Sequence, residues 1–196
     1  METAPIYQCL KKSDFKDQDG YQLVVIRRDD AESIRLWRNA QTDVLRQLTP
    51  ITQEQQRLYF EEVVEPAFDL KEPKQVLFSF LFQHAFIGYG GLTNIDWEAR
   101  RAEVSFLVDP ARAEDQGQYT ADFSHFLSLL SKIAFKEIKL HRLFTETFAF
   151  RKKHMQILEA CGFKREGVLR DHVYKRQEWV DSIMHGLLEG EVGHAQ

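Results

Sequence analysis

The sequence predicts a mixed α/β (α+β) fold, in which a mostly antiparallel twisted sheet is flanked by helices on both faces. Short runs rich in β-branched and aromatic residues alternate with apolar patterns of helical period. Their order is strand, two helices, three strands, helix, strand, helix and two strands. The long central helix separates two strands, and a connection of this kind favours a right-handed parallel crossover within the sheet.

The composition is that of one domain with a sizeable core. The chain has 196 residues, of which 43% are hydrophobic, and 15 of them are phenylalanines. With 26 basic and 30 acidic side chains the net charge is −4, which gives no general electrostatic reason to bind a polyanion. We therefore expect no nucleic-acid partner.

Cysteine usage and hydropathy indicate a cytoplasmic protein. Cys9 and Cys161 are far apart and lack metal-ligand companions, which is typical of a reduced compartment. The chain has no run of about 18 apolar residues, and its N-terminus lacks the basic-then-apolar order of a signal peptide. We expect no membrane partner. The histidines show no metal-ligand spacing with carboxylates or cysteines, so we also expect no metal.

The N-terminal part of the chain predicts a lead-in, a strand and a helix. Residues 1–20 are polar and charged and are expected to form a loosely held lead-in. The β-branched residues 21–27 predict the first strand. Asp29 and Asp30 can cap a helix over residues 31–38, because acidic groups are favourable at a helix N-terminus.

A second helix is predicted after Pro50. Thr52 is a helix N-cap with Gln55 three residues on, the spacing of a capping box, and Pro66 lies near the expected helix end. Four strands and two helices follow. The strands are expected over residues 76–82, 86–92, 103–108 and 142–148, and the helices over residues 119–138 and 151–161.

The chain ends in a predicted hairpin. Gly162 occupies the position of a glycine that ends a helix, directly after residues 151–161. Aliphatic residues then punctuate two strands within residues 163–188. The domain is therefore expected to span residues 21–190, followed by a short tail at residues 191–196.

Three segments carry a family resemblance. Residues 102–108 form a strand followed by Asp109-Pro110, residues 116–121 (QGQYTA) lie at the start of the long helix, and residues 158–163 contain Leu-Glu and Gly-Phe. These segments resemble the GNAT superfamily of acetyl-CoA-dependent N-acetyltransferases, in particular the branch related to ribosomal-protein N-terminal acetyltransferases and amino-sugar N-acetyltransferases. The resemblance implies the GNAT fold and acetyl-CoA as cosubstrate.

The resemblance also places the coenzyme between the central strand and the long helix. The backbone of the strand would flank the pantetheine arm, and amides at the helix start would hold the pyrophosphate. Tyr119 stands where the family has a second glycine, and its Cβ restricts the approach of a phosphate to the backbone. The implied coenzyme-binding residues are Phe106, Leu107, Val108, Gln116, Gly117, Gln118, Tyr119, Thr120 and Arg151.

The implied chemistry is direct transfer of acetyl to an amine, without a covalent enzyme intermediate. Glu103, at the start of the central strand, is the candidate base that removes a proton from the acceptor ammonium. The alternative is a surface glutamate paired with Arg100 or Arg101. Cys161, expected at a buried helix end, is a poor nucleophile candidate.

The proton donor to the departing thiolate has two candidates. Leu158 stands where many family members have a tyrosine for this step, and leucine carries no proton to give. His154 is the candidate substitute because histidine titrates near neutral pH, and the alternative is a structural histidine. Tyr174, in the C-terminal strands, is a further candidate catalytic residue.

The acceptor is expected to be a small-molecule primary amine. Residues 34–39 (IRLWRN) resemble a segment of family members that act on amino-sugar nucleotides, so Arg38 and Asn39 are candidate substrate-binding residues. Glycines in residues 86–92 would let a substrate or the adjacent strand approach closely. The preferred acceptor is an amino sugar, on a nucleotide carrier or free, and the alternative is a protein N-terminus or another small amine. A homodimer is compatible with the resemblance.

A rival reading is a degenerate acyl-CoA-binding module without turnover. Tyr119 and Leu158 support this reading, because each departs from the family pattern at a position with a functional role.

Overall fold

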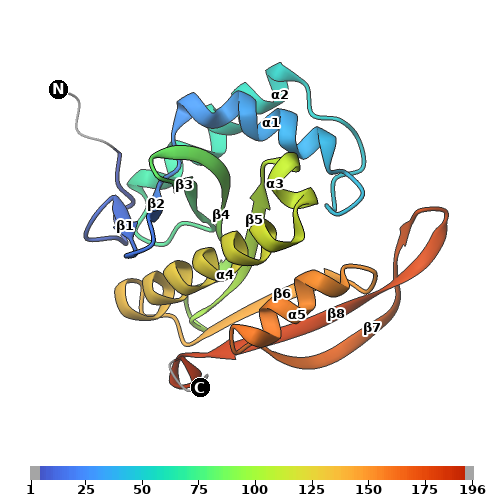
Figure 1. Cartoon of the computed structure of the whole chain (residues 1–196). Coiled ribbons are helices and arrows are strands. Elements are labelled where there is room, and N and C mark those ends of the chain that lie inside the picture. The colour runs from blue at the N-terminus through green and yellow to red at the C-terminus, as the bar shows by residue number, and fades with distance from the viewer. Residues whose placement is uncertain (1–4, 193–196) are drawn as a thin grey trace.

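One twisted sheet of eight strands forms the frame of the molecule. The computed structural model describes residues 5–192, and within them the strand order is β1-β2-β3-β4-β5-β6-β8-β7 (Figure 1). The strands are β1 (Asp14–Lys16), β2 (Tyr21–Val25), β3 (Val76–Phe82), β4 (Ala85–Asp96), β5 (Arg101–Val108), β6 (Arg142–Phe148), β7 (Lys164–Lys175) and β8 (Glu178–Leu188). All neighbouring pairs are antiparallel except β5 and β6, which are parallel. The predicted mixed sheet and its parallel pair are confirmed.

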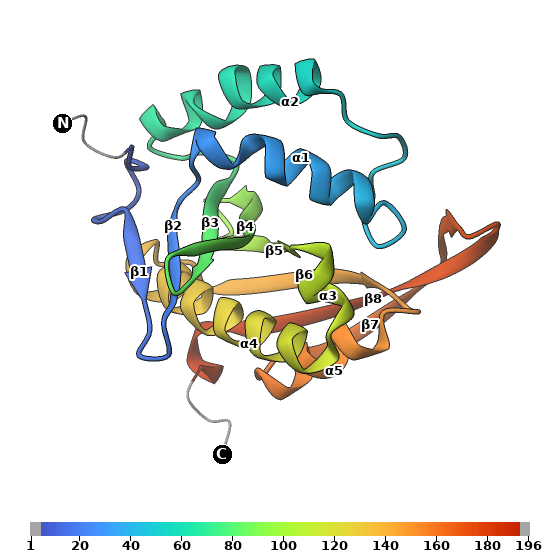
Figure 2. The same cartoon turned by 45° about the horizontal axis from the view of Figure 1, so that its top comes forward.

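Helices cover both faces of this sheet. The helices are α1 (Ala31–Ala40), α2 (Gln53–Tyr59), α3 (Pro110–Glu114), α4 (Gln116–Lys132) and α5 (Lys152–Ala160). Figure 2 shows α1 and α2 on one side of the strands, with α4 and α5 on the other. The sequence did not predict α3, which fills the segment between the central strand and the long helix. The π-helical segments Phe60–Val64 and Ile133–Glu137 continue α2 and α4.

The two helical layers bury separate apolar cores against the sheet. Under α1 and α2 lie Ile34 and Phe60, packed with Leu77 from β3. The larger core lies under α4 and α5 and includes Phe126 and Leu158, both fully buried. Because β3 contributes residues to both cores, it reads as an apolar run interrupted by Ser79.

Two local sequence signals form as predicted. Thr52 Oγ1 accepts a hydrogen bond from Gln55 N, and Gln55 Oε1 accepts one from Thr52 N, which completes the capping box. Gly162 follows α5 with φ +93°, a conformation in which a Cβ would be strained. Phe163 N then donates to Leu158 O at 3.0 Å and closes the helix end.

Asp30 has a different role from the predicted helix cap. It stands at the N-cap of α1, but its side chain makes no capping hydrogen bond. Its buried carboxylate instead accepts from Ser79 Oγ at 2.6 Å and from Arg27 Nε at 2.7 Å. The expectation of a side-chain cap at this residue is therefore wrong, and Asp30 joins the start of α1 to β3.

The glycines of β4 accommodate the neighbouring strands. A Cβ on Gly90 would lie 2.1 Å from Ser105 O of β5, and a Cβ on Gly91 would lie 2.1 Å from Val76 O of β3. Such distances exclude any side chain. Of the two expected roles for these glycines, close strand approach is the one that the geometry supports.

The N-terminal segment is more ordered than its polar composition indicated. Residues 14–16 form the edge strand β1, and the fully buried ring of Tyr7 accepts a hydrogen bond at its oxygen from Leu77 N. The expectation of a loosely held lead-in over residues 1–20 is wrong for the described residues 5–20. Residues 1–4 and 193–196, which include most of the expected tail, lie outside the described residues.

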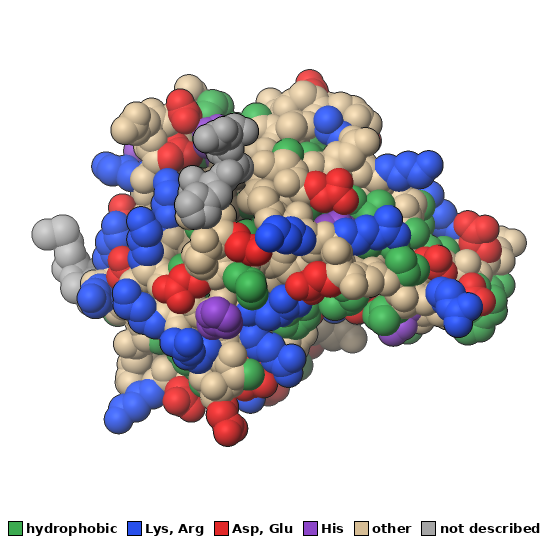
Figure 3. All heavy atoms as spheres, turned by 90° about the horizontal axis from the view of Figure 1, so that it is seen from below, with side chains coloured by type: hydrophobic (Ala, Val, Ile, Leu, Met, Phe, Trp, Pro, Cys, Tyr) green, Lys and Arg blue, Asp and Glu red, His purple; other side chains and the backbone are tan. Residues whose placement is uncertain are grey.

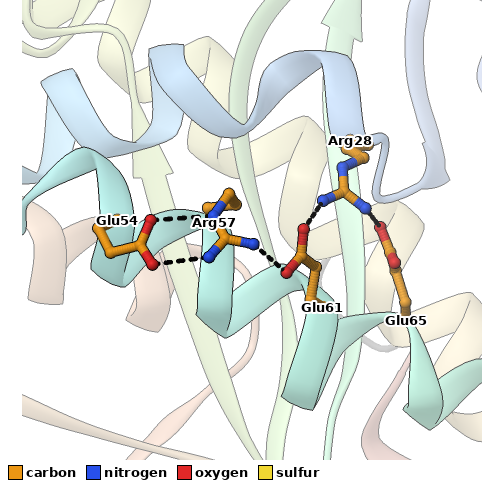
Figure 4. A network of polar contacts seen from close by, with 5 residues as sticks. All are labelled: Arg28, Glu54, Arg57, Glu61 and Glu65. Atoms are coloured by element: carbon orange, nitrogen blue, oxygen red, sulfur yellow. Dashed lines mark hydrogen bonds and ion pairs between the residues drawn. The ribbon is translucent and has the colours of Figure 1, made fainter.

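A chain of ion pairs fastens the turn before α1 to the α2 layer. Figure 4 shows Arg28 between Glu61 and Glu65, at 2.5 and 2.7 Å, and Arg57 between Glu54 and Glu61. These side chains are solvent-exposed, so their contribution to stability is small. They orient α2 rather than hold the fold together.

The surface shows no dominance of one charge on the face drawn in Figure 3, where basic and acidic side chains are interspersed. None of the helices within residues 5–192 is both long and apolar enough to cross a membrane.

Candidate functional site

A fork between the parallel strands β5 and β6 creates the candidate active-site cavity. The two strands pair only where Arg101–Glu103 faces Arg142–Phe144, and beyond these residues they diverge. A cavity of about 230 Å³ occupies the fork. Its walls are residues 103–106 of β5, residues 145–148 of β6, Thr93 and Asn94 of β4, Arg38 of α1, Val44, Leu45 and Arg46 of the loop after α1, Phe123 of α4, Arg151 at the N-cap of α5, and His154 of α5.

Glu103 lies at the point where the strands separate. The residue is only 8% exposed, and its two carboxylate oxygens accept from Arg46 Nη2 at 2.6 Å and from Asn94 Nδ2 at 2.7 Å. The pairing of β4 with β5 shifts register next to Asn94, whose φ is +49°. This irregularity turns the amide of Asn94 toward Glu103.

Glu103 is therefore not a surface residue, and the alternative drawn from the sequence is wrong. Arg101 pairs instead with Asp96 at 3.3 Å. A nearly buried carboxylate at the mouth of a cavity suits a group that meets the substrate.

A second carboxylate faces the same arginine. Glu146 of β6 lies 3.2 Å from Arg46 Nη2, and His172 Nε2 lies 3.5 Å from its other oxygen. Glu103 and Glu146 thus approach one guanidinium nitrogen from opposite arms of the fork. Sequence reasoning missed Glu146 and Arg46, and the signal for Glu146 was an acidic residue within a predicted strand.

At the other end of the cavity, α4 and α5 bring three side chains together. Tyr119 Oη lies 2.7 Å from His154 Nδ1 and accepts from Arg151 Nη2 at 3.0 Å. Because Arg151 donates to the phenol oxygen, the hydroxyl hydrogen is directed to His154 Nδ1, and the imidazole proton is assigned to Nε2. The ring of Phe123 stacks on His154 with centroids 4.2 Å apart.

The environment keeps His154 and Tyr119 neutral. Burial, and then the nearby charge of Arg151, hold the pKa of His154 well below its ordinary value. Burial raises the pKa of Tyr119, against the opposing effect of Arg151. The expectation that His154 titrates near neutral pH is therefore wrong, and it serves as a hydrogen-bond acceptor for Tyr119.

The sequence did not indicate the contact made by the Tyr119 side chain. Tyr119 stands in a glycine pattern, which concerns the backbone, while its side chain reaches across to α5. Leu158, where the family pattern has a tyrosine, is fully buried in the core. The protonated phenol of Tyr119 lies next to the cavity, whereas the side chain of Leu158 does not reach the cavity.

The start of α4 is already occupied by a carboxylate. Asp115 Oδ1 accepts from Gly117 N and Gln118 N, both at 2.9 Å, and Thr120 Oγ1 donates to Gln116 O at 2.6 Å. The amides expected to hold a pyrophosphate therefore satisfy a side-chain cap. An incoming phosphate would have to displace Asp115 or bind beside it.

A second cavity adjoins this helix start and is rich in cations. It has a volume of about 500 Å³, and its lining includes Gln116 and Tyr119 together with Arg151, Lys152 and Lys153. Arg151 and His154 line both cavities. Three basic side chains at the mouth of the fork are suited to the phosphates of coenzyme A.

The three strand residues expected to flank the coenzyme differ in their surroundings. Phe106 lines the fork and stacks on Phe123 with centroids 4.5 Å apart. Leu107 and Val108 are buried in the two opposite cores. The carbonyl of Val108 accepts from Gln41 Nε2 at 2.8 Å, so this end of β5 meets the end of α1.

The expected substrate residues Arg38 and Asn39 make contacts within the protein. Arg38 lines the fork, but its guanidinium donates to Tyr89 Oη at 2.6 Å and to Gln47 Oε1 at 3.1 Å. Asn39 donates to Ile51 O and accepts from Ile51 N, both at 2.8 Å. It shapes the loop between α1 and α2.

Tyr174 lies apart from the other candidate catalytic residues. It is 60% exposed near the tip of the β7–β8 hairpin, where its ring meets Trp179. It is not among the described residues that line the fork. The structure thus brings together Glu103, His154 and Arg151, and places Tyr174 elsewhere.

One group of residues with metal-ligand chemistry forms away from the fork. Within the described chain, ligand atoms of Asp17, Asp19 and His125 lie within 4.8 Å of one another. The histidine spacing did not indicate this group, because α4 and the β1–β2 turn are distant in sequence. The hydrogen bond between His125 Nδ1 and Asp17 Oδ2, at 2.8 Å, accounts for its geometry.

Comparison with known proteins points to one family. The model of the acetyltransferase (GNAT) domain matches residues 23–184. A mutant of the spermidine N-acetyltransferase SpeG from Vibrio cholerae is similar in structure, with a TM-score of 0.74 and 19% identity, over 89% of this chain and 97% of that chain. The spermidine N-acetyltransferase from Vibrio cholerae in complex with CoA and spermine has a TM-score of 0.75 and 17% identity, over 88% and 97%. No curated protein matches the sequence.

Proposed function

The chain belongs to the GNAT acetyltransferases and is an N-acetyltransferase, and we propose that its acceptor is a primary amine of a small polycationic molecule. The observation that carries the proposal is the pair of carboxylates, Glu103 and Glu146, that face one nitrogen of Arg46 across the fork. Two carboxylates converging on one point in a partly buried cavity favour an ammonium group there.

The known structures support a small amine more than an amino sugar. The similar proteins of known structure include spermidine N-acetyltransferases, and one of these was solved with CoA and spermine. The amino-sugar acceptor expected from the sequence relied on Arg38 and Asn39, whose polar groups are engaged inside the protein. A homodimer stays a prediction.

The acetyl donor of this family is acetyl-CoA, which supplies an activated thioester, and the fork fits such a donor. We place the pantetheine arm along the open edge of β5, where β6 has diverged. Arg151, Lys152 and Lys153 would meet the phosphates. The capped amides of Gly117 and Gln118 contribute less than the family pattern implies, because Asp115 already uses them.

Glu103 starts the proposed reaction by taking a proton from the acceptor ammonium. The freed lone pair forms the new carbon–nitrogen bond at the thioester carbonyl, and the carbon–sulfur bond breaks. The Tyr119 hydroxyl, with Arg151 donating to its oxygen, turns from His154 Nδ1 to the departing sulfur and gives up its proton there. The ammonium loses two protons: one passes through Glu103 to solvent, and the other balances the proton that Tyr119 supplies.

The test is a thiol-release assay with acetyl-CoA and three acceptors: spermidine, an N-terminal peptide and a nucleotide-linked amino sugar. We expect release with spermidine, and we expect Glu146→Gln to raise its KM. Glu98→Gln, an exposed glutamate in a turn outside the fork, is the matched control. A clear preference for the amino-sugar nucleotide, unaffected by Glu146→Gln, would overturn the acceptor assignment.

A further inference from the structure

Arg46 occupies the place that the acceptor ammonium would take. It belongs to the loop between α1 and α2, its side chain is 50% exposed, and its Nη2 reaches both Glu103 and Glu146. This nitrogen is thus a cation held between the two carboxylates that the proposed function assigns to the acceptor. Arg46 and the acceptor cannot hold this position together.

The need for a cation there follows from burial. Glu103 is 8% exposed, and among residues 5–192 its carboxylate receives one further side-chain hydrogen bond, from Asn94. Leaving a nearly buried carboxylate without a partner is costly. Arg46 therefore stabilises the cavity while no acceptor is present, and an ammonium could replace it one charge for one charge.

The backbone of the loop is held independently of Arg46. Lys175 Nζ, from the β7–β8 hairpin, donates to Thr42 O at 2.9 Å, and Arg176 pairs with Asp43 at 2.9 Å. At its other end the loop is fixed by Asn39 through Ile51. Figure 2 shows this loop and the hairpin at the same end of the molecule. Only the Arg46 side chain has to swing into solvent for the site to open.

We propose that Arg46 is a built-in competitor of the acceptor, and that a polycationic amine binds by displacing its guanidinium from Glu103 and Glu146. This inference rests on the proposed function, because it takes the same carboxylates as the acceptor site. Displacement also frees the base, because the Glu103 oxygen that accepts from Arg46 becomes available to the acceptor ammonium. Acceptor binding and release of Glu103 are thus one event.

Such competition has a defined kinetic signature. The acceptor binds only those molecules in which Arg46 has vacated the site. The apparent affinity is therefore the intrinsic affinity multiplied by the fraction of such molecules. Removing Arg46 should therefore lower the KM for spermidine by about three- to tenfold. Turnover at saturating acceptor should change by less than about twofold, since the bound complex is the same in both proteins.

The experiment compares wild type, Arg46→Ala and Arg101→Ala, all with spermidine. Arg101 is an equally exposed arginine that pairs with Asp96 outside the fork, so its variant should resemble wild type. Binding of spermidine to the protein saturated with coenzyme A is measured by calorimetry beside the steady-state kinetics. We expect tighter binding and a lower KM for Arg46→Ala only.

The binding measurement separates this inference from the proposed function. Equal or weaker spermidine binding by Arg46→Ala, or none at all, would overturn the competitor role, since both carboxylates are then free. A lower kcat with unchanged KM would show instead that Arg46 positions Glu103, and would also overturn it. If Arg46→Ala binds spermidine more tightly but neither wild type nor any variant transfers acetyl to it, the result would support the role of Arg46 and contradict the proposed function.

Discussion

The phenol oxygen of Tyr119 lies 2.7 Å from Nδ1 of His154, so a residue at the start of α4 and a residue of α5 form one hydrogen-bonded pair. Arg151 donates to the same oxygen, which fixes the direction of the hydroxyl. The pair provides a proton-bearing group beside the cavity, at a place where the buried Leu158 provides none. The proposed proton donor therefore lies on a different helix from the one that the family pattern indicates.

Replacing Tyr119 with phenylalanine tests this assignment. The ring and its packing on Phe106 are retained, while the proton is lost. We expect kcat to fall by about 10²-fold, the lower end of typical acid–base contributions, with little change in the affinity for acetyl-CoA. Tyr59→Phe, which removes a hydroxyl hydrogen-bonded to the Gln75 side chain outside the fork, is the control. Equal kcat in both variants would show that solvent, and not Tyr119, gives the proton to the departing sulfur.

Glu103→Gln tests the base. Glutamine keeps the shape and the contact with Asn94 but cannot accept a proton at neutral pH. We expect turnover to fall by about 10²–10⁴-fold while coenzyme A binding, measured by calorimetry, stays the same. Glu98→Gln serves as the matched exposed control. A loss of less than about threefold would leave Glu103 as a structural partner of Arg46, because general bases contribute more than this.

Asp115→Asn should strengthen coenzyme A binding. Asparagine can still cap α4, but it removes a negative charge from the amides of Gly117 and Gln118, beside the expected phosphate site. A few-fold decrease in Kd is expected by calorimetry, and it should shrink as salt is added. Glu114→Gln neutralises the preceding exposed residue and controls for net charge. Equal effects of the two variants would place the phosphates away from this helix start.

The burial of His154 predicts a pH dependence of stability. Its pKa is depressed in the folded state, so below about pH 6.5 the unfolded chain binds a proton that the folded chain does not. The free energy of unfolding should therefore fall as the pH drops below this value, by up to about 1.4 kcal/mol per pH unit for this one group. Urea unfolding between about pH 5 and 7 measures the slope.

His154→Asn should flatten that slope, whatever its effect on stability at neutral pH. His84→Asn is the control, because His84 is exposed in a turn with φ +68°, a conformation that asparagine tolerates. An unchanged slope in His154→Asn would show that another group carries the acid sensitivity.

Local signals in the sequence were sufficient where one stretch of chain decides the structure. The capping box at Thr52, the glycine stop at Gly162 and the apolar run of β3 each depend on near neighbours in sequence, and each forms as expected. The order of strands and helices followed from such signals. The edge strand β1 was missed because Phe15 is a single buried residue within a charged segment.

The site could be predicted only in part, because its contacts join distant segments. Glu103 was found from its place on the central strand. Its partner Arg46 lies on an irregular loop, and nothing in the local sequence indicates which carboxylate that arginine meets. The pairing of Tyr119 with His154 likewise depends on the packing of α4 against α5. Asp115 caps α4 by accepting from the Gly117 amide, which a phosphate would otherwise bind, and the glycine pattern does not indicate this cap.

The most direct test of the central claim is the ratio of kcat/KM for spermidine to kcat/KM for a monoamine of similar length. Wild type should favour spermidine, because Glu103 and Glu146 carry two negative charges and an amine with a single charge leaves one of them unbalanced. Glu146→Gln should remove most of this preference and leave the monoamine little affected. Equal kcat/KM values for the two amines, in wild type and in Glu146→Gln alike, would contradict an acceptor site built from paired carboxylates.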